Sequence, residues 1–359
     1  MKIGIDKATG FSYFFIHFSI EVLCFFVLGR LFTSFSAEKW IAYLIFDVLA
    51  FATQPFIGTF LEAHPRWRIG LWGNVMLIVG AIGALVLQRF FIPMLIGLGV
   101  CTLGNACMHI SGAVATARAS EGRLSEPALF VGGGSFGVIT GRMLALSSAN
   151  WIIAFAPACV SILLIALTDR RIKKKYGDSA YDFAHNPVKH NISRNRKPAV
   201  VVAILFLIVV ARGYIGYGLP TGWSTLGIHT VLLFVFMGLG KVLGGILSDI
   251  FGPRKVGFFS CIVALPVLLL SDKYMWPSLV GIAMFSMTMA ITLGGLYSVM
   301  KYTPAVAFGA TTVALLIGSA PIFFMNIPSQ LVCNVLNIVM SILSFGGIWY
   351  CIKDNTGKE

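Results

Sequence analysis

The sequence predicts an all-α membrane protein in which twelve transmembrane helices form two six-helix bundles. Three observations lead to this prediction. Of the 359 residues, 57% are hydrophobic and only 11% are charged, whereas soluble domains carry about 25% charged residues. The apolar residues form long continuous runs instead of the alternating pattern of an outer-membrane β-barrel. One long polar stretch, 169–197, divides these runs six and six.

Each apolar run is long enough to cross a bilayer, which requires about 20 mainly apolar residues. Between polar or Gly/Pro-rich breaks we expect spans at 10–32, 37–61, 69–87, 91–117, 126–148, 150–168, 198–218, 227–249, 255–271, 275–299, 303–325 and 328–352. Residues 1–168 are then an N-terminal bundle, 169–197 a basic linker and 198–359 a C-terminal bundle. The first run lacks a small-residue cleavage site, so we expect it to be retained.

The lysines and arginines in the predicted loops indicate the orientation of the chain. If both termini are cytoplasmic, the cytoplasmic segments contain 20 of these residues, and the opposite side contains only Arg30, Lys39, Arg89 and Lys273. This bias explains most of the net charge of +13 without a nucleic-acid partner. We expect a monomer surrounded by lipid in the plasma membrane of a bacterium. The seven cysteines lack the spacing of a disulfide framework or a zinc site, and we expect no cofactor and no metal.

Two loops carry the same pattern of residues. After the eighth run the pattern is Gly245, Asp249, Gly252, Arg254 and Lys255, and after the second run it is Gly58, Glu62, Pro65, Arg66 and Arg68. In both loops an acidic residue follows a glycine by four positions and basic residues come next. The repetition indicates two related halves, which is the construction of many secondary transporters.

The loop after the eighth run resembles motif A of the major facilitator superfamily, with Ile250 in place of the usual basic residue. The chain also resembles the fosmidomycin-resistance branch of that superfamily over most of its length. Four segments carry this likeness: His17–Glu21, Gln54–Pro55 with Gly58 and His64–Pro65, Met108–Ile110, and Phe130–Arg142. Arg212 is a weaker match. Ile110 and Arg142 replace prolines of the branch, and Ser135 replaces an asparagine.

The resemblance implies a transporter that works by rocker-switch alternating access. It also implies that spans 1, 4, 7 and 10 line a central cavity, which makes Glu21, His109 and Arg212 cavity groups. Arg142 replaces the proline of a Gly-Pro pair associated with antiporters, so an antiport mechanism is not carried over.

Five charged residues lie inside the predicted spans and away from their ends: Glu21, Asp47, Arg142, Arg212 and Lys241. A charge at mid-bilayer costs roughly 2.5–3.5 kcal/mol, so we expect these side chains to face the protein interior. We predict that Glu21 carries a coupling proton, with His17 one helical turn away and Asp47 as a second proton site. The alternative is that both acids form static ion pairs. Glu21 would then pair with Arg142 or Arg212, and Asp47 with Lys241 or Arg142.

Four further predictions concern the substrate and helix packing. His109, Arg142, Arg212 and Lys241 are candidate substrate-binding residues, and three interior cations against two acids favour an anionic substrate. Alternatively, the arginines only neutralise the acids. Gly133, Gly137 and Gly141 lie on one helix face and predict close packing against a neighbouring span.

We expect the two loop motifs to act as a cytoplasmic latch that holds an outward-facing state, with Arg66, Arg68, Arg254 and Lys255 as partners of Glu62 and Asp249. The predicted function is secondary, proton-coupled transport of a small organic molecule, with efflux favoured. The alternatives are an uptake carrier for an organic anion and a transport-inactive receptor or scaffold. An intramembrane enzyme is not indicated, because HExxH and paired catalytic aspartates do not occur.

Overall fold

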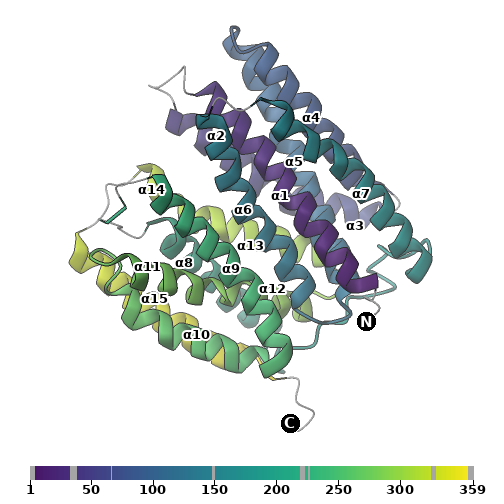
Figure 1. Ribbon diagram of the computed structural model, residues 1–359. Coiled ribbons are helices and arrows are strands. Elements are labelled where there is room, and N and C mark those ends of the chain that lie inside the picture. The colour runs from purple at the N-terminus through teal and green to yellow at the C-terminus, as the bar shows by residue number, and fades with distance from the viewer. Residues whose placement is uncertain are drawn as a thin grey trace.

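The computed structural model describes residues 5–32, 39–65, 67–147, 150–218, 223–224, 227–324 and 329–354. Regular structure in these residues is helical, apart from one antiparallel bridge between Ser193 and Ile352 (Figure 1). The helices of the first half are α1 (Ile5–Leu31), α2 (Lys39–Ala52), α3 (Gln54–Ala63), α4 (Ile69–Val86), α5 (Phe91–Ser120), α6 (Ser125–Leu146) and α7 (Ile152–Tyr176). Those of the second half are α8 (Pro198–Gly218), α9 (Gly227–Phe251), α10 (Pro253–Leu268), α11 (Met275–Ser286), α12 (Thr288–Val299), α13 (Pro304–Ser319), α14 (Pro321–Phe324) and α15 (Gln330–Cys351).

The helices occupy all twelve predicted segments, and the predicted all-α membrane fold is confirmed. Within the described residues, ten helical segments are long and apolar enough to cross a bilayer, with α2 and α3 forming one of them and α11 and α12 another. The two remaining segments are the 16-residue helices α10 and α13. The predicted ends differ by several residues at some helices. For example, α7 continues to Tyr176, so the first part of the predicted linker is helical.

The second predicted span is interrupted at Thr53, between α2 and α3. Pro55 causes the interruption, because a proline has no backbone N–H to donate to the carbonyl four residues earlier. That carbonyl belongs to Phe51, and Thr312 of α13 donates its hydroxyl to it at 3.1 Å. A Cβ on Gly309 of α13 would lie only 2.6 Å from the Pro55 nitrogen. The broken helix is therefore fitted closely against the second half of the chain.

The helices form two groups, α1–α7 and α8–α15, as Figure 1 shows. In the first group α1 packs on α6 and α4 on α5, and in the second α13 packs on α8 and α10 on α15. The groups contact each other mainly through α6 against α9 and α13 against α3. They lie close together at the end that carries residues 177–197 and diverge at the opposite end (Figure 1). We call these two ends the linker face and the far face.

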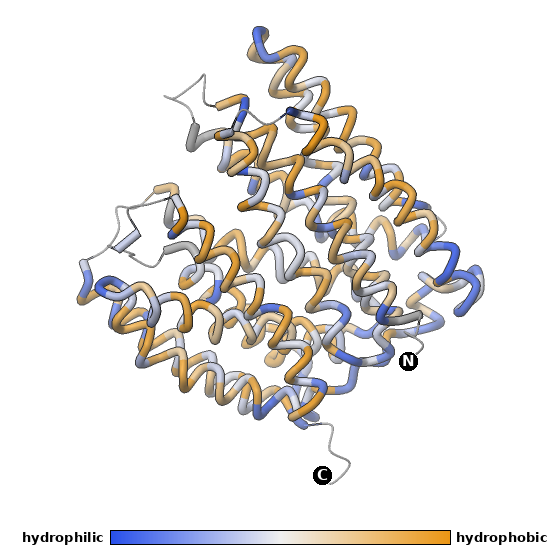
Figure 2. The backbone as a smooth tube through the Cα atoms, in the orientation of Figure 1, coloured by the Kyte–Doolittle hydropathy of each residue, from blue (hydrophilic) through white to orange (hydrophobic). Residues whose placement is uncertain are grey.

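The linker face is the most hydrophilic part of the molecule. Figure 2 shows hydrophilic residues gathered there, while the helix surfaces between the two faces are mostly hydrophobic. Large apolar side chains on these surfaces are exposed, including Phe56, Val86 and Leu331, each more than 70% exposed. An apolar belt with polar ends is the surface that a bilayer requires.

The glycines of α6 set the distance between α6 and α1. A Cβ on Gly133, Gly137 or Gly141 would collide with a backbone carbonyl oxygen of α1, belonging to Phe14, Phe18 or Val22 respectively. The predicted close packing of this glycine face is therefore confirmed, and its partner is the first span. This packing places the polar residues of α1 directly against α6.

Candidate functional site

A cavity of about 590 Å³ lies between the two halves. It extends from Met289 and His17 in the middle of the protein to Gly29, Leu146 and Phe323, which lie toward the far face. The predicted site residues that line it are His17, Glu21, Asp47, His109, Arg142, Arg212 and Lys241. The structure thus brings together, from α1, α2, α5, α6, α8 and α9, every residue predicted for proton coupling or substrate binding.

Glu21 is the centre of a buried polar cluster at the inner end of this cavity. Its Oε1 lies 3.4 Å from His109 Nε2 and 3.8 Å from His17 Nε2. Asn105 donates from Nδ2 to the same carboxylate oxygen at 2.9 Å. All four residues are at most 6% exposed. Asn105 was not among the predicted site residues, because an asparagine in an apolar helix gives no signal that distinguishes it from a packing residue.

Backbone contacts determine the tautomer of both histidines. Nδ1 of His17 faces the carbonyl oxygen of Phe130 at 2.7 Å, and Nδ1 of His109 faces the carbonyl oxygen of Asn105 at 3.0 Å. A carbonyl oxygen only accepts, so both Nδ1 atoms carry a hydrogen. In the neutral rings both Nε2 atoms are then lone-pair acceptors that point at a third acceptor, the Glu21 carboxylate. A proton placed among these three atoms converts a repulsion into a hydrogen bond.

The cationic side chains line the same cavity and are held by different partners. Lys241 of α9 donates to Ser135 Oγ of α6 at 2.8 Å, a hydrogen bond that joins the two halves. Arg212 donates from Nη1 to Thr292 Oγ1 at 3.1 Å. Neither contact is with a carboxylate. Both side chains line the cavity together with Glu21, so they add positive charge near it.

Arg142 lies among aromatic rings. Its guanidinium carbon is 5.3 Å from the ring centre of Phe25, 5.6 Å from that of Tyr43 and 5.5 Å from that of Phe234. Its Nε is buried and has no hydrogen-bond partner in the part of the chain that the structure describes. Asp47 is close enough to Arg142 to interact with it electrostatically. Phe234 belongs to the second half, so this aromatic cage also spans the cavity.

The ligand atoms of His17, Glu21 and His109 all lie within 4.8 Å of one another. Two imidazoles and a carboxylate form a donor set that can hold a transition-metal ion. Lys241, Arg142 and Arg212 line the same cavity and oppose the approach of a dication. The charge balance therefore favours a single proton at this cluster, and we do not assign it as a metal site.

The motif carboxylates form matching contacts on the linker face. Asp249 of α9 accepts hydrogen bonds from the backbone amides of Leu124 and Ser125 at 2.8 and 2.9 Å, at the start of α6. Glu62 of α3 accepts from the amides of Ala305 and Val306 at 2.8 and 3.3 Å, at the start of α13. Each carboxylate therefore caps a helix of the opposite half.

The motif glycines make these contacts possible. A Cβ on Gly58 would lie 2.9 Å from the backbone of Ala305, and a Cβ on Gly245 would lie 2.6 Å from the carbonyl oxygen of Leu124. Gly252 has a φ of 96°, a conformation that favours glycine, and it turns the chain from α9 into α10. The two loops thus share their geometry as well as their sequence pattern.

The hydrogen-bond donors to the two acids differ from the predicted ones, since they are backbone amides instead of basic side chains. Arg254 stacks on the Trp349 ring at 3.6 Å, and the amides of Arg254 and Lys255 donate to Asp354. The Arg68 side chain is exposed. Arg66 lies outside the described residues. The sequence signal for the true donors was indirect, because any residue at a helix start offers a free amide.

Solved structures with the same fold are transporters. The E. coli fucose:proton symporter has a TM-score of 0.64 at 15% identity, over 95% of this chain and 98% of that chain. A bacterial homologue of the iron transporter ferroportin, in an outward-facing state, has a TM-score of 0.66 at 14% identity, over 96% and 98%. The proton:xylose symporter XylE has a TM-score of 0.66 at 14% identity, over 99% and 96%.

No protein-family model matches the sequence, and no curated protein sequence matches it significantly. The structural likeness extends over nearly the whole length of both chains. It agrees with the predicted fold class. The chain has the fold of the major facilitator superfamily transporters.

Proposed function

We propose that this chain is a secondary active transporter of the major facilitator superfamily that moves a small organic molecule across the membrane. Residues 1–168 and 198–359 are the two rocking units, and 169–197 is the linker between them. The contacts of Asp249 and Glu62 keep the linker face closed, while the cavity extends toward the far face. This is the geometry of one end state of an alternating-access cycle.

The observation that carries the proposal is the convergence of three buried acceptors, His17 Nε2, His109 Nε2 and Glu21 Oε1, in the cavity between the halves. Transport is coupled to protons through this cluster, and Glu21 is the group that exchanges the proton. The cavity gives the cluster access to one side, and rocking would give it access to the other. Asp47 is a second proton site in the same cavity.

The substrate is anionic and is held by Arg142, Arg212, Lys241 and His109. These side chains surround a cavity of about 590 Å³, a volume suited to a small molecule. Arginine donates in a fork that matches carboxylate, phosphonate and phosphate groups. The likeness to the fosmidomycin-resistance branch favours efflux, and His17, Glu21, His109 and Arg142, which belong to three of the segments that carry this likeness, all line the cavity.

The linker face is cytoplasmic and the far face is external, so that both termini lie inside and the membrane is the plasma membrane of a bacterium. The hydrophilic linker face agrees with the distribution of lysines and arginines in the loops (Figure 2). The functional unit is a monomer, because the cavity is complete within one chain.

A transport assay with a pH-sensitive dye tests this function. The protein is reconstituted into proteoliposomes, a pH gradient is imposed, and fosmidomycin and a panel of small carboxylates and phosphonates are added one at a time. We expect at least one of these anions to dissipate the gradient in protein-containing vesicles and not in empty ones. The direction of substrate movement relative to protons distinguishes efflux from the alternative, uptake of an organic anion.

Two further outcomes would change the proposal. If a compound stabilises the purified protein but none of the panel moves across the vesicles, the chain is a receptor or scaffold. If cationic compounds are moved and anionic ones are not, the assignment of Arg142, Arg212 and Lys241 to substrate binding is wrong.

A further inference from the structure

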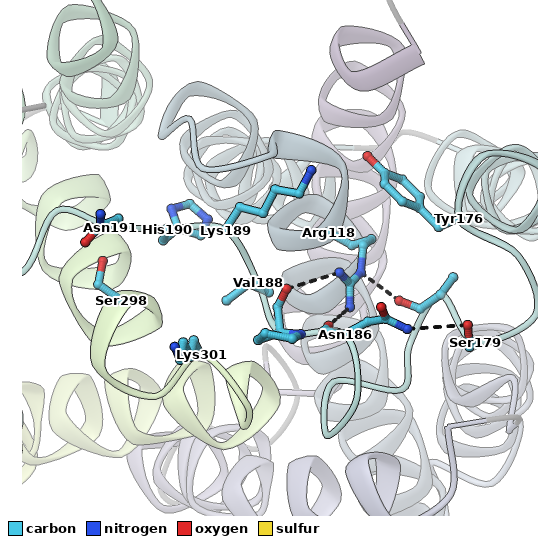
Figure 3. Close-up of a pocket in the computed structure, with 12 residues that line it drawn as sticks. Arg118, Tyr176, Ser179, Asn186, Val188, Lys189, His190, Asn191, Ser298 and Lys301 are labelled. Carbon is cyan, nitrogen blue, oxygen red and sulfur yellow. Dashed lines mark hydrogen bonds between the residues drawn. The ribbon is translucent and has the colours of Figure 1, made fainter. Parts of the chain in front are cut away.

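A second cavity, of about 690 Å³, lies on the linker face, away from the central cavity. Its wall combines the end of α5, the end of α7, the linker, the end of α12, and Lys301, two residues beyond α12 (Figure 3). Ser298 and Lys301 border it on one side and Tyr176 and Ser179 on the other. The first half, the linker and the second half therefore all contribute to a single pocket.

The pocket contains a buried cation that forms no ion pair among the described residues. Arg118 is 7% exposed and donates from Nε to the carbonyl oxygen of Ala180 at 2.7 Å. Its terminal nitrogens donate to the carbonyl oxygens of Asn186 and Pro187 (Figure 3). Three carbonyl groups accept hydrogen bonds from the guanidinium but carry no net charge, and Asp182 attracts it without forming an ion pair. A buried charge without an ion-pair partner is costly.

A buried histidine faces the same space with one free nitrogen. His190 is 3% exposed, and its Nε2 lies 3.2 Å from the hydroxyl of Ser120. That hydroxyl donates to the carbonyl of Ala117, so it accepts from His190. Nδ1 of His190 has no hydrogen-bond partner among the described residues. An unpartnered, buried polar atom in a pocket wall is unusual in a folded protein and indicates a missing partner.

The charged residues that line the pocket all have one sign. Lys189 and Lys301 are exposed at its rim, and none of the described residues that line it is acidic. Two acids lie outside this lining. Glu121 is held by Lys175 at 2.8 Å and by the Tyr176 hydroxyl at 2.9 Å and also attracts Lys189, and Asp182 attracts Arg118. Three cations and a histidine around a hollow of this volume form an electrostatic trap for an anion.

We propose that this pocket binds a phosphate-bearing anion, with Lys189 and Lys301 contacting the phosphate and Arg118 providing the buried positive field. A phosphate supplies several strong acceptor oxygens for the two lysines, and a protonated phosphate oxygen can donate to His190 Nδ1. The same chemistry is offered by a soluble phosphate compound and by the headgroup of an anionic lipid at the membrane surface. The experiment below distinguishes these two sources.

Binding has a conformational consequence that rests on the proposed alternating access. Two hydrogen bonds attach the linker to the second half. The amide of Val188 donates to the carbonyl oxygen of Lys301 at 3.0 Å, and the amide of Ile192 donates to Ser298 Oγ at 2.9 Å. The linker is attached to the first half through Arg118. When the linker face opens, these two sets of contacts cannot both persist, so the pocket exists only in the closed form. An anion that binds the pocket therefore holds the linker face closed and slows transport.

The test uses the full-length protein in nanodiscs of phosphatidylcholine, which carries no net charge. The soluble probe is radiolabelled pyrophosphate, and the lipid probe is phosphatidic acid added to the disc and counted by native mass spectrometry. The pocket variant is Lys189→Gln with Lys301→Gln. The matched control is Lys174→Gln with Lys197→Gln, which removes the same charge from exposed positions outside the pocket.

We expect the pocket variant to bind at least one probe tenfold or more weakly, while the control changes binding less than twofold. Loss of pyrophosphate binding identifies a soluble ligand, and loss of bound phosphatidic acid identifies a lipid. The proposal is overturned if the pocket variant binds each probe as well as the control variant does. It is also overturned if the unmodified protein binds neither probe. Asn191→Trp, which fills the pocket without changing its charge, must give the same loss as the lysine variant.

The conformational step has its own readout. Spin labels at Arg171 and Phe251, one in each half and both exposed, report the separation of the halves on the linker face. The exposed Cys159 is replaced by serine in this background. Whichever probe binds, pyrophosphate or phosphatidic acid, must increase the population in which the two spin labels are closer together. The pocket variant must lose this effect. If the probe binds but the distances do not change, the pocket binds an anion without controlling access. If the distances never change under any condition, the proposed alternating access is wrong.

Discussion

Glu62 of α3 and Asp249 of α9 occupy equivalent positions in the two halves, and each carboxylate accepts hydrogen bonds from the first amides of a helix in the opposite half. The start of a helix has free N–H groups and a partial positive charge, so a carboxylate satisfies both. The closed linker face is therefore held by two interactions of the same kind.

Removing either carboxylate should shift the protein toward opening on the linker face. A lost helix cap costs about 1 kcal/mol, so we expect Asp249→Ala and Glu62→Ala each to raise the open population roughly fivefold and the double variant to raise it further. Distances between spin labels at Arg171 and Tyr302 measure this change. Asp178→Ala, which removes an exposed acid from the linker, is the control and should leave the distances unchanged. Unchanged distances in the double variant would contradict the latch.

Replacing Glu21 with glutamine should separate coupling from transport. Glutamine keeps the shape of the side chain and an acceptor for Asn105, but it cannot carry the exchangeable proton. We expect transport driven by a pH gradient to fall at least tenfold, while exchange of labelled for unlabelled substrate across the membrane continues. Glu121→Gln, on the linker face, is the matched control. Full gradient-driven transport by the Glu21 variant would assign the residue to structure alone.

Small side chains should be required on one face of α6. Gly137→Ala places a methyl group against the carbonyl of Phe18, and we expect a loss of about 1–3 kcal/mol in stability. Gly99→Ala is the control, because a Cβ at Gly99 of α5 meets nothing within 4 Å. Melting temperatures in detergent compare the two. Equal temperatures for both variants would mean that α1 and α6 are not closely packed in solution.

The stability of the protein should depend on pH through His190. Burial lowers the pKa of His190 to about 4 from 6.5, so between these values the unfolded chain binds a proton that the folded chain does not. Stability therefore falls as the pH falls from 6.5 to 4, by up to about 3 kcal/mol. We expect the melting temperature to drop in this range, and to drop less in His190→Gln.

The groups that face His190 determine how an anion changes this behaviour. The ring packs on Tyr297, with ring centres 5.2 Å apart, and the cations Arg118, Lys189 and Lys301 line the same pocket. These cations disfavour a protonated ring, and a bound anion would offset them. Saturating sulfate, which keeps its charge across this range, should therefore reduce the loss of stability at low pH. A pH profile that is the same with and without sulfate would contradict the assignment of His190 to the anion pocket.

The fold could be predicted from the sequence because it depends on patterns that a bilayer imposes. Long apolar runs predict the spans, and the linker 169–197 marks the midpoint. The interruption at Thr53 could be foreseen only in part. Pro55 indicates a break, but its position depends on Thr312, which supplies a donor for the freed carbonyl of Phe51.

The candidate site could be predicted as a set of residues but not as a set of contacts. Charges in apolar runs must face the interior, so Glu21, Arg142 and Lys241 were found this way. The rotation of each helix about its axis is not encoded in composition, and it decides that Glu21 faces His109 while Lys241 faces Ser135. The donors to Asp249 are backbone amides, which no side-chain pattern reveals.

The glycine face of α6 also determines how α1 can respond to the proposed protonation of Glu21. Because α1 and α6 touch through their main chains at Gly133, Gly137 and Gly141, neither helix can rotate or slide past the other without separating. If Glu21 exchanges a proton as proposed, the resulting change of charge acts on α1 and α6 as one unit, because their main chains are in contact along this face.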